Sequence, residues 1–241
     1  MCGRFTLYSS PVVLAREFEL GALPLLFPRY NIAPTQPVAM VRISAESGAR
    51  EWALARWGLV PSWADDVKIG QRMINARSET VAEKPSFRAA FRRRRCLIPV
   101  DGYYEWQVSP TDGKRPFYIR RFDQRPLAIA GLWESWQSPD GTPLETCTLL
   151  TTAANDRLRP IHDRMPVFLD EPSRQLWLDP ETPAPALLQR MQAANDDLFE
   201  TIEVSKRVNN PRHEAPDCIE PLETRHPLET HERPAASPPS E

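Results

Sequence analysis

The second residue of this chain brings two reactive groups together. Cys2 follows the initiator in the opening MCGRF, and its side chain is small enough for methionine aminopeptidase to remove Met1. The mature chain is then expected to begin at Cys2, with a free α-amine and a thiol on one residue. Both groups are nucleophiles near neutral pH, so Cys2 is the first candidate for covalent chemistry.

Three further polar side chains lie in sequence motifs whose residue types a purely structural role does not require. Asn75 lies in INARSET, Glu105 stands between aromatic residues in GYYEW, and His162 lies in IHDRMPV. Each has an ordinary structural alternative, such as a partly exposed strand carboxylate for Glu105 and a hydrogen-bonded structural histidine for His162. Their joint occurrence with Cys2 favours a catalytic site, because a carboxylate and an imidazole can move protons.

Candidate contacts to an anionic ligand lie in neighbouring stretches. RYNIAPTQ and WGLVPSWA combine aromatic, proline and amide groups in segments that we expect to be loops. Arg77 precedes a helix that is expected to start at Ser78, where free backbone amides can bind an anion. Taken alone, the tryptophans of WGLVPSWA are more typical of a core than of a platform for stacking bases.

The elements that must position these residues are mainly strands. Turn signals such as SPTDGK and SPDGTP separate short apolar runs, which indicates hairpins and therefore mainly antiparallel pairing. No repeat or linker interrupts the body, so we predict one α+β domain of mainly antiparallel β-sheets with short flanking helices. Strands are expected at 37–43, 52–60, 96–100, 103–108, 116–121, 127–136, 146–153 and 199–205, and helices at 11–20, 78–84, 85–91, 171–178 and 183–194.

Composition narrows the class of protein. The 241 residues suit one globular domain. No apolar run approaches the roughly 18 residues that a membrane helix needs, and the chain lacks a signal-peptide opening. We therefore expect a cytoplasmic protein with no membrane partner. The four cysteines lie far apart without CxxC spacing, so we expect no disulfide framework, no metal site and no cofactor.

Charge is unevenly spread along the chain. The net charge of −2 argues against a generic nucleic-acid binder, although the acidic C-terminal end leaves the body mildly basic. The stretch FRAAFRRRRC packs five arginines into positions 88–95. These arginines could grip phosphates or could form a solvated helix end before a strand, and the sequence leaves both interpretations open.

Seven blocks, in this order, resemble the signature of the SRAP family (SOS response-associated peptidase, or abasic-site processing proteins). They are MCGRF, RYNIAP, WGLVPSWA, INARSET, CLIPVDGYYEW, TTAAND with IHDRMPV, and VSKRVNN. The resemblance covers residues 2–222, which we expect to be an SRAP domain, and implies a barrel-like core of antiparallel sheets. It leaves 223–241 as an acidic, proline-rich tail that is predicted to be disordered.

The resemblance implies chemistry on damaged DNA. Family members act on abasic sites in single-stranded DNA, where the ring-opened sugar exposes an aldehyde. An amino-terminal cysteine suits an aldehyde, because its amine forms an imine and its thiol then closes a thiazolidine ring, which gives a durable cross-link. The imine also permits β-elimination at the 3′ phosphate. AP-lyase activity and autoproteolytic processing are therefore expected beside cross-linking, within DNA repair and the SOS response.

The resemblance also assigns roles to individual residues. Cys2 is the nucleophile, Asn75 holds its backbone or amine, Glu105 accepts the proton of the amine, and His162 transfers a proton to the sugar oxygen. The implied DNA contacts, by phosphate binding, hydrogen bonding or stacking, are Arg4, Pro34, Trp63, Arg77, Ser78 and Thr151. Family members often carry a second aromatic residue after WGxxPxW, where this chain has Ala64.

Two other classes of function stay open. A cysteine peptidase would use the Cys2 thiol with His162 as its base. A nonenzymatic module that binds single-stranded DNA would keep its whole function in Cys2→Ala. A zinc site built from Cys2 and His162 has no supporting ligand spacing. The expected partners are single-stranded DNA with abasic sites and replication-fork proteins, bound by a monomer that associates with the nucleoid when it acts on DNA.

Overall fold

Two β-sheets and a few short helices make up the structure. The computed structural model describes residues 2–222, so the tail predicted at 223–241 lies outside the described residues. The strands are β1 (Phe5–Leu7), β2 (Arg29–Ile32), β3 (Pro37–Ile43), β4 (Arg50–Trp57), β5 (Asn75–Arg77), β6 (Arg95–Val100), β7 (Gly102–Ser109), β8 (Gly113–Arg121), β9 (Leu127–Gln137), β10 (Pro143–Ala153), β11 (Arg164–Pro166) and β12 (Phe199–Glu203). The helices are α1 (Pro11–Glu17), α2 (Arg88–Arg93), α3 (Glu171–Leu178) and α4 (Ala184–Arg190), with 3-10 turns η1 (Val67–Arg72), η2 (Asp196–Leu198), η3 (Lys206–Asn209) and η4 (Pro216–Ile219).

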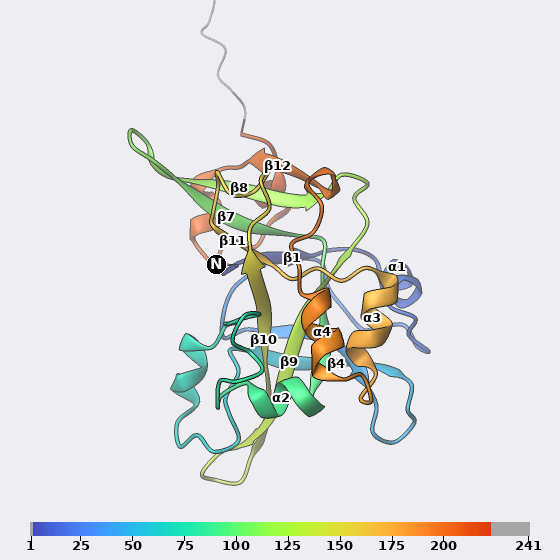
Figure 1. Cartoon of the computed structure of the whole chain (residues 1–241). Coiled ribbons are helices and arrows are strands. Elements are labelled where there is room, and N and C mark those ends of the chain that lie inside the picture. Colours follow the sequence, from blue (N-terminus) through green and yellow to red (C-terminus); the bar gives the residue numbers. More distant parts are fainter. Residues whose placement is uncertain (1, 223–241) are drawn as a thin grey trace, which may run out of the picture.

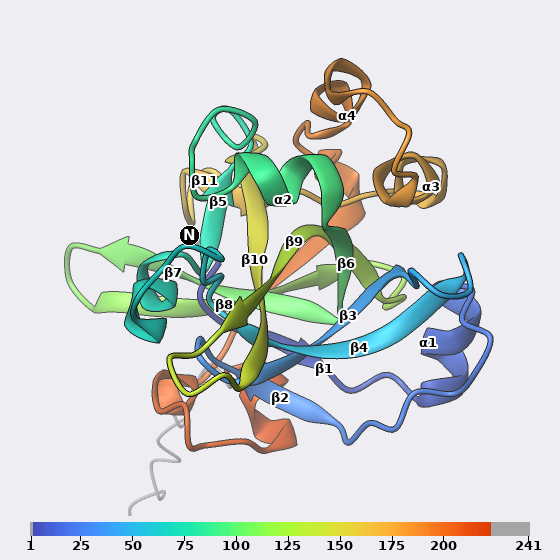
Figure 2. The same cartoon turned by 90° about the horizontal axis from the view of Figure 1, so that it is seen from below.

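The larger sheet closes on itself into a barrel. β10 pairs in parallel with β4, and antiparallel pairs of β4 with β3, β3 with β6, β6 with β9 and β9 with β10 complete the ring. Figure 2 looks into this ring from below. β5 and β11 extend it, because both pair with the C-terminal half of β10. Closure removes the open edges that would otherwise expose unpaired backbone groups.

The second sheet is antiparallel throughout and carries the start of the chain. Its order is β12-β8-β7-β1-β2, so the short β1 lies between β7 and β2. Figure 1 shows this sheet above the barrel, with α3 and α4 to one side. The predicted α+β class, with mainly antiparallel sheets, a barrel-like core and short flanking helices, is confirmed.

The barrel strands differ in how far they are covered: in β4 only Ala55 and Trp57 are buried, whereas β6 is covered on both faces. Every residue of β6 is buried, as expected for a strand with two covered faces. α3 covers β6, and its Trp177 donates from Nε1 to the carbonyl oxygen of Cys96 at 2.9 Å. Among the helices of residues 2–222, none is long and apolar enough to cross a bilayer.

The differences from the predicted elements fall close to the candidate site. α1 begins as predicted, since the Ser10 side chain accepts from the backbone amide of Val13. The helix predicted at 78–84 is wrong, because that stretch is a run of turns and α2 begins only at Arg88. β1, β2, β5 and β11 are not predicted by the sequence, because three or four residues carry too little alternation to identify a strand.

Two glycines bring the WGLVPSWA segment against η1. Gly58 has φ +126°, and a Cβ there would lie 2.6 Å from the carbonyl oxygen of Gly70. A Cβ on Gly70 would lie 2.4 Å from the carbonyl oxygen of Gly58. Only glycine permits this approach of two backbones, so the pair fixes how the segment with Trp63 leaves β4.

We expect Gly58→Ala to lower the free energy of unfolding by roughly 2 to 4 kcal/mol, because the backbone conformation and the contact with Gly70 both oppose a methyl group. Urea unfolding followed by tryptophan fluorescence measures this loss. Gly48→Ala is the matched control, because Gly48 also has a positive φ (+68°) but has open space around it. The control should lose only about 1 kcal/mol, and equal losses in both variants would contradict the close approach.

Candidate active site

Cys2 is held inside the protein at the entrance to β1. Its side chain is fully buried, and the backbone that follows is fixed by the bond from the Tyr104 amide to the Arg4 carbonyl oxygen at 2.9 Å. Asn75 Nδ2 donates to the Cys2 carbonyl oxygen at 2.7 Å. Asn75 lies in β5, which pairs with β10 at Leu149. The side-chain amide of Asn75 therefore ties the start of the second sheet to the barrel.

The Cys2 thiol is a neutral group in the resting protein. Its Sγ lies 3.9 Å from the carbonyl oxygen of Arg4. Burial raises the pKa of the thiol well above its usual range, and the negative charge of the nearby Glu105 raises it further. A thiolate is disfavoured at this position, because an apolar environment does not solvate the charge.

Glu105 lies in the middle of β7 and is 3 % exposed. Burial raises the pKa of its carboxyl group, while the positive charge of the nearby His162 opposes the shift. Glu105 and His162 line one pocket of about 410 Å³ together with Arg4, Trp106, Lys114 and Asn209. The two residues that the sequence predicts for proton transfer therefore line the same pocket. The negative charge of Glu105 also raises the pKa of the Cys2 thiol.

His162 sits in the connection between β10 and β11. Its Nδ1 lies 3.0 Å from the backbone nitrogen of Arg164, whose N–H donates to it. The same Nδ1 lies 2.9 Å from Asp163 Oδ1. These contacts orient the imidazole ring at the wall of the pocket that it lines with Glu105.

Arg4 forms one wall of the pocket and is held by internal acceptors. Its Nη1 donates to Asn31 Oδ1 at 2.8 Å and to the Val208 carbonyl oxygen at 2.7 Å. Its guanidinium lies 5.9 Å from the ring centroid of Trp106, and Trp106 Nε1 in turn donates to Asn209 Oδ1 at 2.7 Å. Arg4 Nε is buried without a partner among the described residues, which leaves a donor for a ligand.

Asn31 fixes this wall, although it is not among the site residues that the sequence predicts. Its side chain is fully buried, and Nδ2 lies within hydrogen-bond distance of three carbonyl oxygens of the C-terminal segment 206–214. Those acceptors belong to Val208 (3.2 Å), Asn210 (3.0 Å) and His213 (2.7 Å). The only signal in the sequence is that RYNIAP and VSKRVNN are both signature blocks.

The predicted DNA contacts differ in how far they can reach a ligand. Arg77 is exposed, Pro34 is half-buried, and Trp63 is 59 % exposed. Thr151 is buried, and its hydroxyl lies 3.5 Å from the Ala76 carbonyl oxygen. No distance relates any of these residues to DNA, so their roles stay predictions.

The anion-binding helix start that was predicted at Ser78 is wrong. No helix begins there, and the Ser78 amide donates to the Thr151 carbonyl oxygen at 2.9 Å. This backbone bond continues the pairing of β5 with β10, so the amide is already used. The Ser78 residue is also largely buried. Any contact of Ser78 with DNA would need its side chain rather than a free backbone amide.

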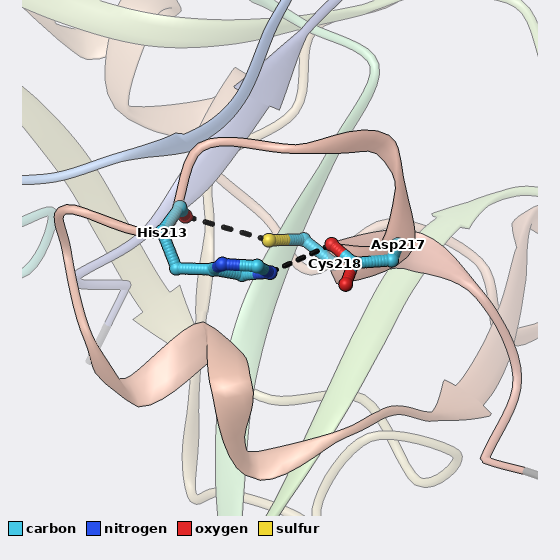
Figure 3. A group of neighbouring side chains, drawn as sticks. All are labelled: His213, Asp217 and Cys218. Atoms are coloured by element: carbon cyan, nitrogen blue, oxygen red, sulfur yellow. Dashed lines mark hydrogen bonds and ion pairs between the residues drawn. The ribbon is translucent and has the colours of Figure 1, made fainter.

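A cluster of His213, Asp217 and Cys218 has potential metal-ligand atoms within 4.8 Å of one another. Figure 3 shows that its members already bond to each other, with His213 Nε2 2.7 Å from Asp217 Oδ1 and Cys218 Sγ 3.5 Å from the His213 carbonyl oxygen. Asp217 also pairs with Arg207 at 2.9 Å. Burial raises the pKa of the Cys218 thiol. The contacts within the cluster and with Arg207 explain it as a structural feature that stabilises the C-terminal segment.

We expect Asn31→Ala to lower the free energy of unfolding by roughly 3 kcal/mol, because it removes one of the two acceptors of Arg4 Nη1 and the donor shared by three carbonyl groups of the segment 206–214. Urea unfolding measures the loss. Asn195→Ala is the control, since Asn195 is exposed and its side chain makes no cap hydrogen bond. The control should change stability by less than about 0.5 kcal/mol. Equal effects would show that Asn31 does not hold the segment.

We expect Glu105→Gln to be more stable than the wild type at pH 7. Because the folded pKa is raised, folding disfavours the ionised carboxylate, and the stability of the wild type falls as the pH rises above the unfolded value of about 4.3. The gain of the variant should therefore shrink as the pH falls from 7 towards about 4.3 and should be absent below that value. Urea unfolding midpoints between pH 4 and pH 7, spanning that value, test this.

Glu134→Gln is the matched control for Glu105→Gln. Glu134 is also buried, but it pairs with Arg94 at 2.6 Å. Removing its charge breaks this pair, so the variant should be less stable than the wild type at pH 7. A wild type that equals or exceeds Glu105→Gln in stability at pH 7 would contradict the assigned environment of Glu105.

Comparison with known proteins agrees with this architecture. The family model described as SOS response associated peptidase (SRAP) matches residues 1–211. The abasic site processing protein YoqW of Bacillus subtilis is 43% identical over 224 residues, covering 91% of this chain and 99% of that protein. The abasic site processing protein HMCES of Xenopus tropicalis is 33% identical over 222 residues, covering 80% of this chain and 65% of that protein.

Solved structures share the fold. A crystal structure of a protein from Bacteroides thetaiotaomicron superposes with a TM-score of 0.81 at 22% identity and covers 92% of this chain and 100% of that chain. A protein from Bordetella bronchiseptica gives a TM-score of 0.73 at 27% identity, covering 85% of this chain and 100% of that chain.

Proposed function

This chain belongs to the SOS response associated peptidase (SRAP) family, and we propose that it processes abasic sites by a covalent cross-link through Cys2. The relatives that are named abasic site processing proteins support the substrate. The observation that carries the proposal is the hydrogen bond from Asn75 to the Cys2 carbonyl oxygen. It holds the first residue of the mature chain near Glu105 and the pocket that Glu105 lines with His162.

The first step is attack of the Cys2 α-amine on the aldehyde carbon of the opened sugar. Met1 has to be removed first, because an amide nitrogen does not attack a carbonyl group. Glu105 takes the proton of the ammonium form, which its raised pKa favours. Asn75 Oδ1 is buried without a partner among the described residues, so it can accept a hydrogen bond that orients the amine. Loss of one water, assisted by His162, gives the imine.

The second step closes the thiazolidine ring. The Cys2 sulfur bonds to the imine carbon, and the thiol proton moves to the imine nitrogen, so no further reactant is needed. This step tolerates a thiol that is neutral at rest, as the raised pKa of Cys2 requires. Burial of the thiol also favours attack on a carbon that is already bonded to the same residue. The product keeps the protein attached to the DNA.

The same imine allows a competing reaction. A base in the pocket can remove the proton next to the imine carbon, and elimination then breaks the bond to the 3′ phosphate. Ring closure removes the imine, so AP-lyase activity and stable cross-linking compete for one intermediate. Arg4 and Arg77 are proposed to hold phosphates, and Trp63 is proposed to stack on a base. A cytoplasmic location and a role in the SOS response belong to this proposal.

A peptidase without DNA chemistry is the second candidate, because the family description includes that activity. Such an enzyme attacks with a thiolate activated by a neighbouring base. The raised pKa of the Cys2 thiol disfavours a resting thiolate. The burial of Cys2 therefore supports amine attack more than thiolate attack, and autoproteolytic processing stays a proposed secondary activity of the same residues.

We expect wild-type protein to form a heat-stable adduct with single-stranded DNA that carries one abasic site, and Cys2→Ser to form none. The serine variant keeps the α-amine, so borohydride should still trap its imine. Cys96→Ser, which alters another fully buried thiol, should cross-link like the wild type. Denaturing gels of labelled DNA, with and without borohydride, separate the two products.

Three results would contradict the proposal. A heat-stable adduct in Cys2→Ser without borohydride would exclude the thiazolidine. Failure of borohydride to trap Cys2→Ser would exclude the imine. An unmodified wild type whose mass shows that Met1 has been removed would exclude Cys2 as the nucleophile towards abasic sites.

A further inference from the structure

The arginine-rich stretch at 88–95 divides into residues that serve the fold and residues that do not. Arg95 is buried, and its guanidinium donates to the carbonyl oxygens of Trp177 at 2.6 Å and Phe91 at 2.9 Å. Arg94 pairs with Glu134 at 2.6 Å. These two arginines tie α2 to its surroundings, so the fold accounts for them.

The other three, Arg88, Arg92 and Arg93, form what we call the α2 surface. All three are exposed, and none makes an ion pair with a residue of the described part, 2–222. With Ala89 and Arg94 they line a surface pocket of about 350 Å³. Arg88 and Arg92 stand one helical turn apart, and like charges at that spacing destabilise a helix by a few tenths of a kcal/mol. Arg92 and Arg93 lie in the last turn of α2, where positive charge is favourable, but no ion pair of the described part accounts for this surface.

The α2 surface is connected to other parts of the chain that are proposed to contact DNA. The turns at 78–87 lead directly from Arg77 in β5 to α2. Glu134, the partner of Arg94, lies two residues before Trp136 in β9. Trp136 Nε1 donates to the carbonyl oxygen of Ala64 at 2.6 Å, next to the exposed Trp63. Figure 1 shows α2 at the lower end of the barrel, away from the N-terminus, so the strand would have to run along the barrel to reach it.

We propose that the α2 surface binds the phosphate backbone of single-stranded DNA that continues beyond the nucleotide held in the Cys2 pocket. This inference rests on the proposed function, because it needs single-stranded DNA as the ligand. Charge complementarity favours a phosphate ligand. A planar guanidinium group can donate two parallel hydrogen bonds to phosphate oxygens. The residues that line the pocket include no acidic side chain. Contacts of this kind hold the strand without reading its sequence.

The test measures binding of intact single-stranded DNA by fluorescence anisotropy at several salt concentrations. Oligonucleotides of about 4 and about 16 nucleotides span the usual site sizes of single-strand binders. Arg88→Gln/Arg92→Gln should weaken binding of the longer oligonucleotide and lower the slope of log K against log salt by about 1.4, since each lost phosphate contact contributes about 0.7. Binding of the shorter oligonucleotide should stay at the wild-type value.

The matched control is Arg16→Gln/Arg190→Gln, which removes the same charge from exposed positions on α1 and α4. It should leave the slope for the longer oligonucleotide unchanged. An unchanged slope in Arg88→Gln/Arg92→Gln, as expected if the acidic segment 223–241 covers the surface instead, would overturn the proposal. An equal loss in the control, or an equal loss for both lengths, would also overturn it, because the effect would then be one of net charge.

The experiment separates this inference from the proposed function. Intact DNA has no aldehyde, so binding can be measured whether or not Cys2 reacts. If the wild type binds with the expected slope but forms no adduct with abasic DNA, the cross-linking proposal fails while the α2 surface stands. If adducts form normally and the slope of the arginine variant is unchanged, the α2 surface fails alone.

Discussion

The burial of Cys2 at the start of the chain is the constraint on which the site depends. A chain end is normally solvated and mobile, but Cys2 is fully buried and its carbonyl group is held by Asn75. That hydrogen bond joins the two sheets, because Asn75 belongs to β5 beside the barrel strand β10 and Cys2 leads into β1. The barrel thus fixes the position of Cys2 relative to the second sheet.

Burial then sets the chemistry of the groups around this residue. It raises the pKa of the Cys2 thiol and of the Glu105 carboxyl group, so both groups favour their neutral forms more than they do in water. A carboxylate with a raised pKa is a stronger base, and a neutral thiol can still add to an imine. His162 lines the same pocket as Glu105. Desolvation of Glu105 therefore lowers the stability of the folded protein and makes the Glu105 carboxylate a stronger base.

The sequence predicts the barrel strands well, because they are long, apolar runs bounded by turn residues, and it predicts α3 with its observed bounds. It does not predict β1, β2 or β5, because these are held by pairing with distant strands rather than by a local pattern. The predicted site residues could be named from their motifs. Asn31 could not, since one of its acceptors, Val208, lies 177 residues away along the chain. The anion site predicted at Ser78 fails because strand pairing, invisible in the local sequence, uses its amide.

The most direct test of the account is to count the thiols of the purified cross-link. The protein has four cysteines, and thiazolidine formation consumes the thiol of Cys2 and releases one water. Alkylation of the denatured adduct, followed by intact mass analysis, should show the chain without Met1 joined to the DNA less one water, with three cysteines modified; free protein should show four. Four modified cysteines in the adduct would mean that the Cys2 sulfur is not bonded to the sugar, which would contradict the central claim.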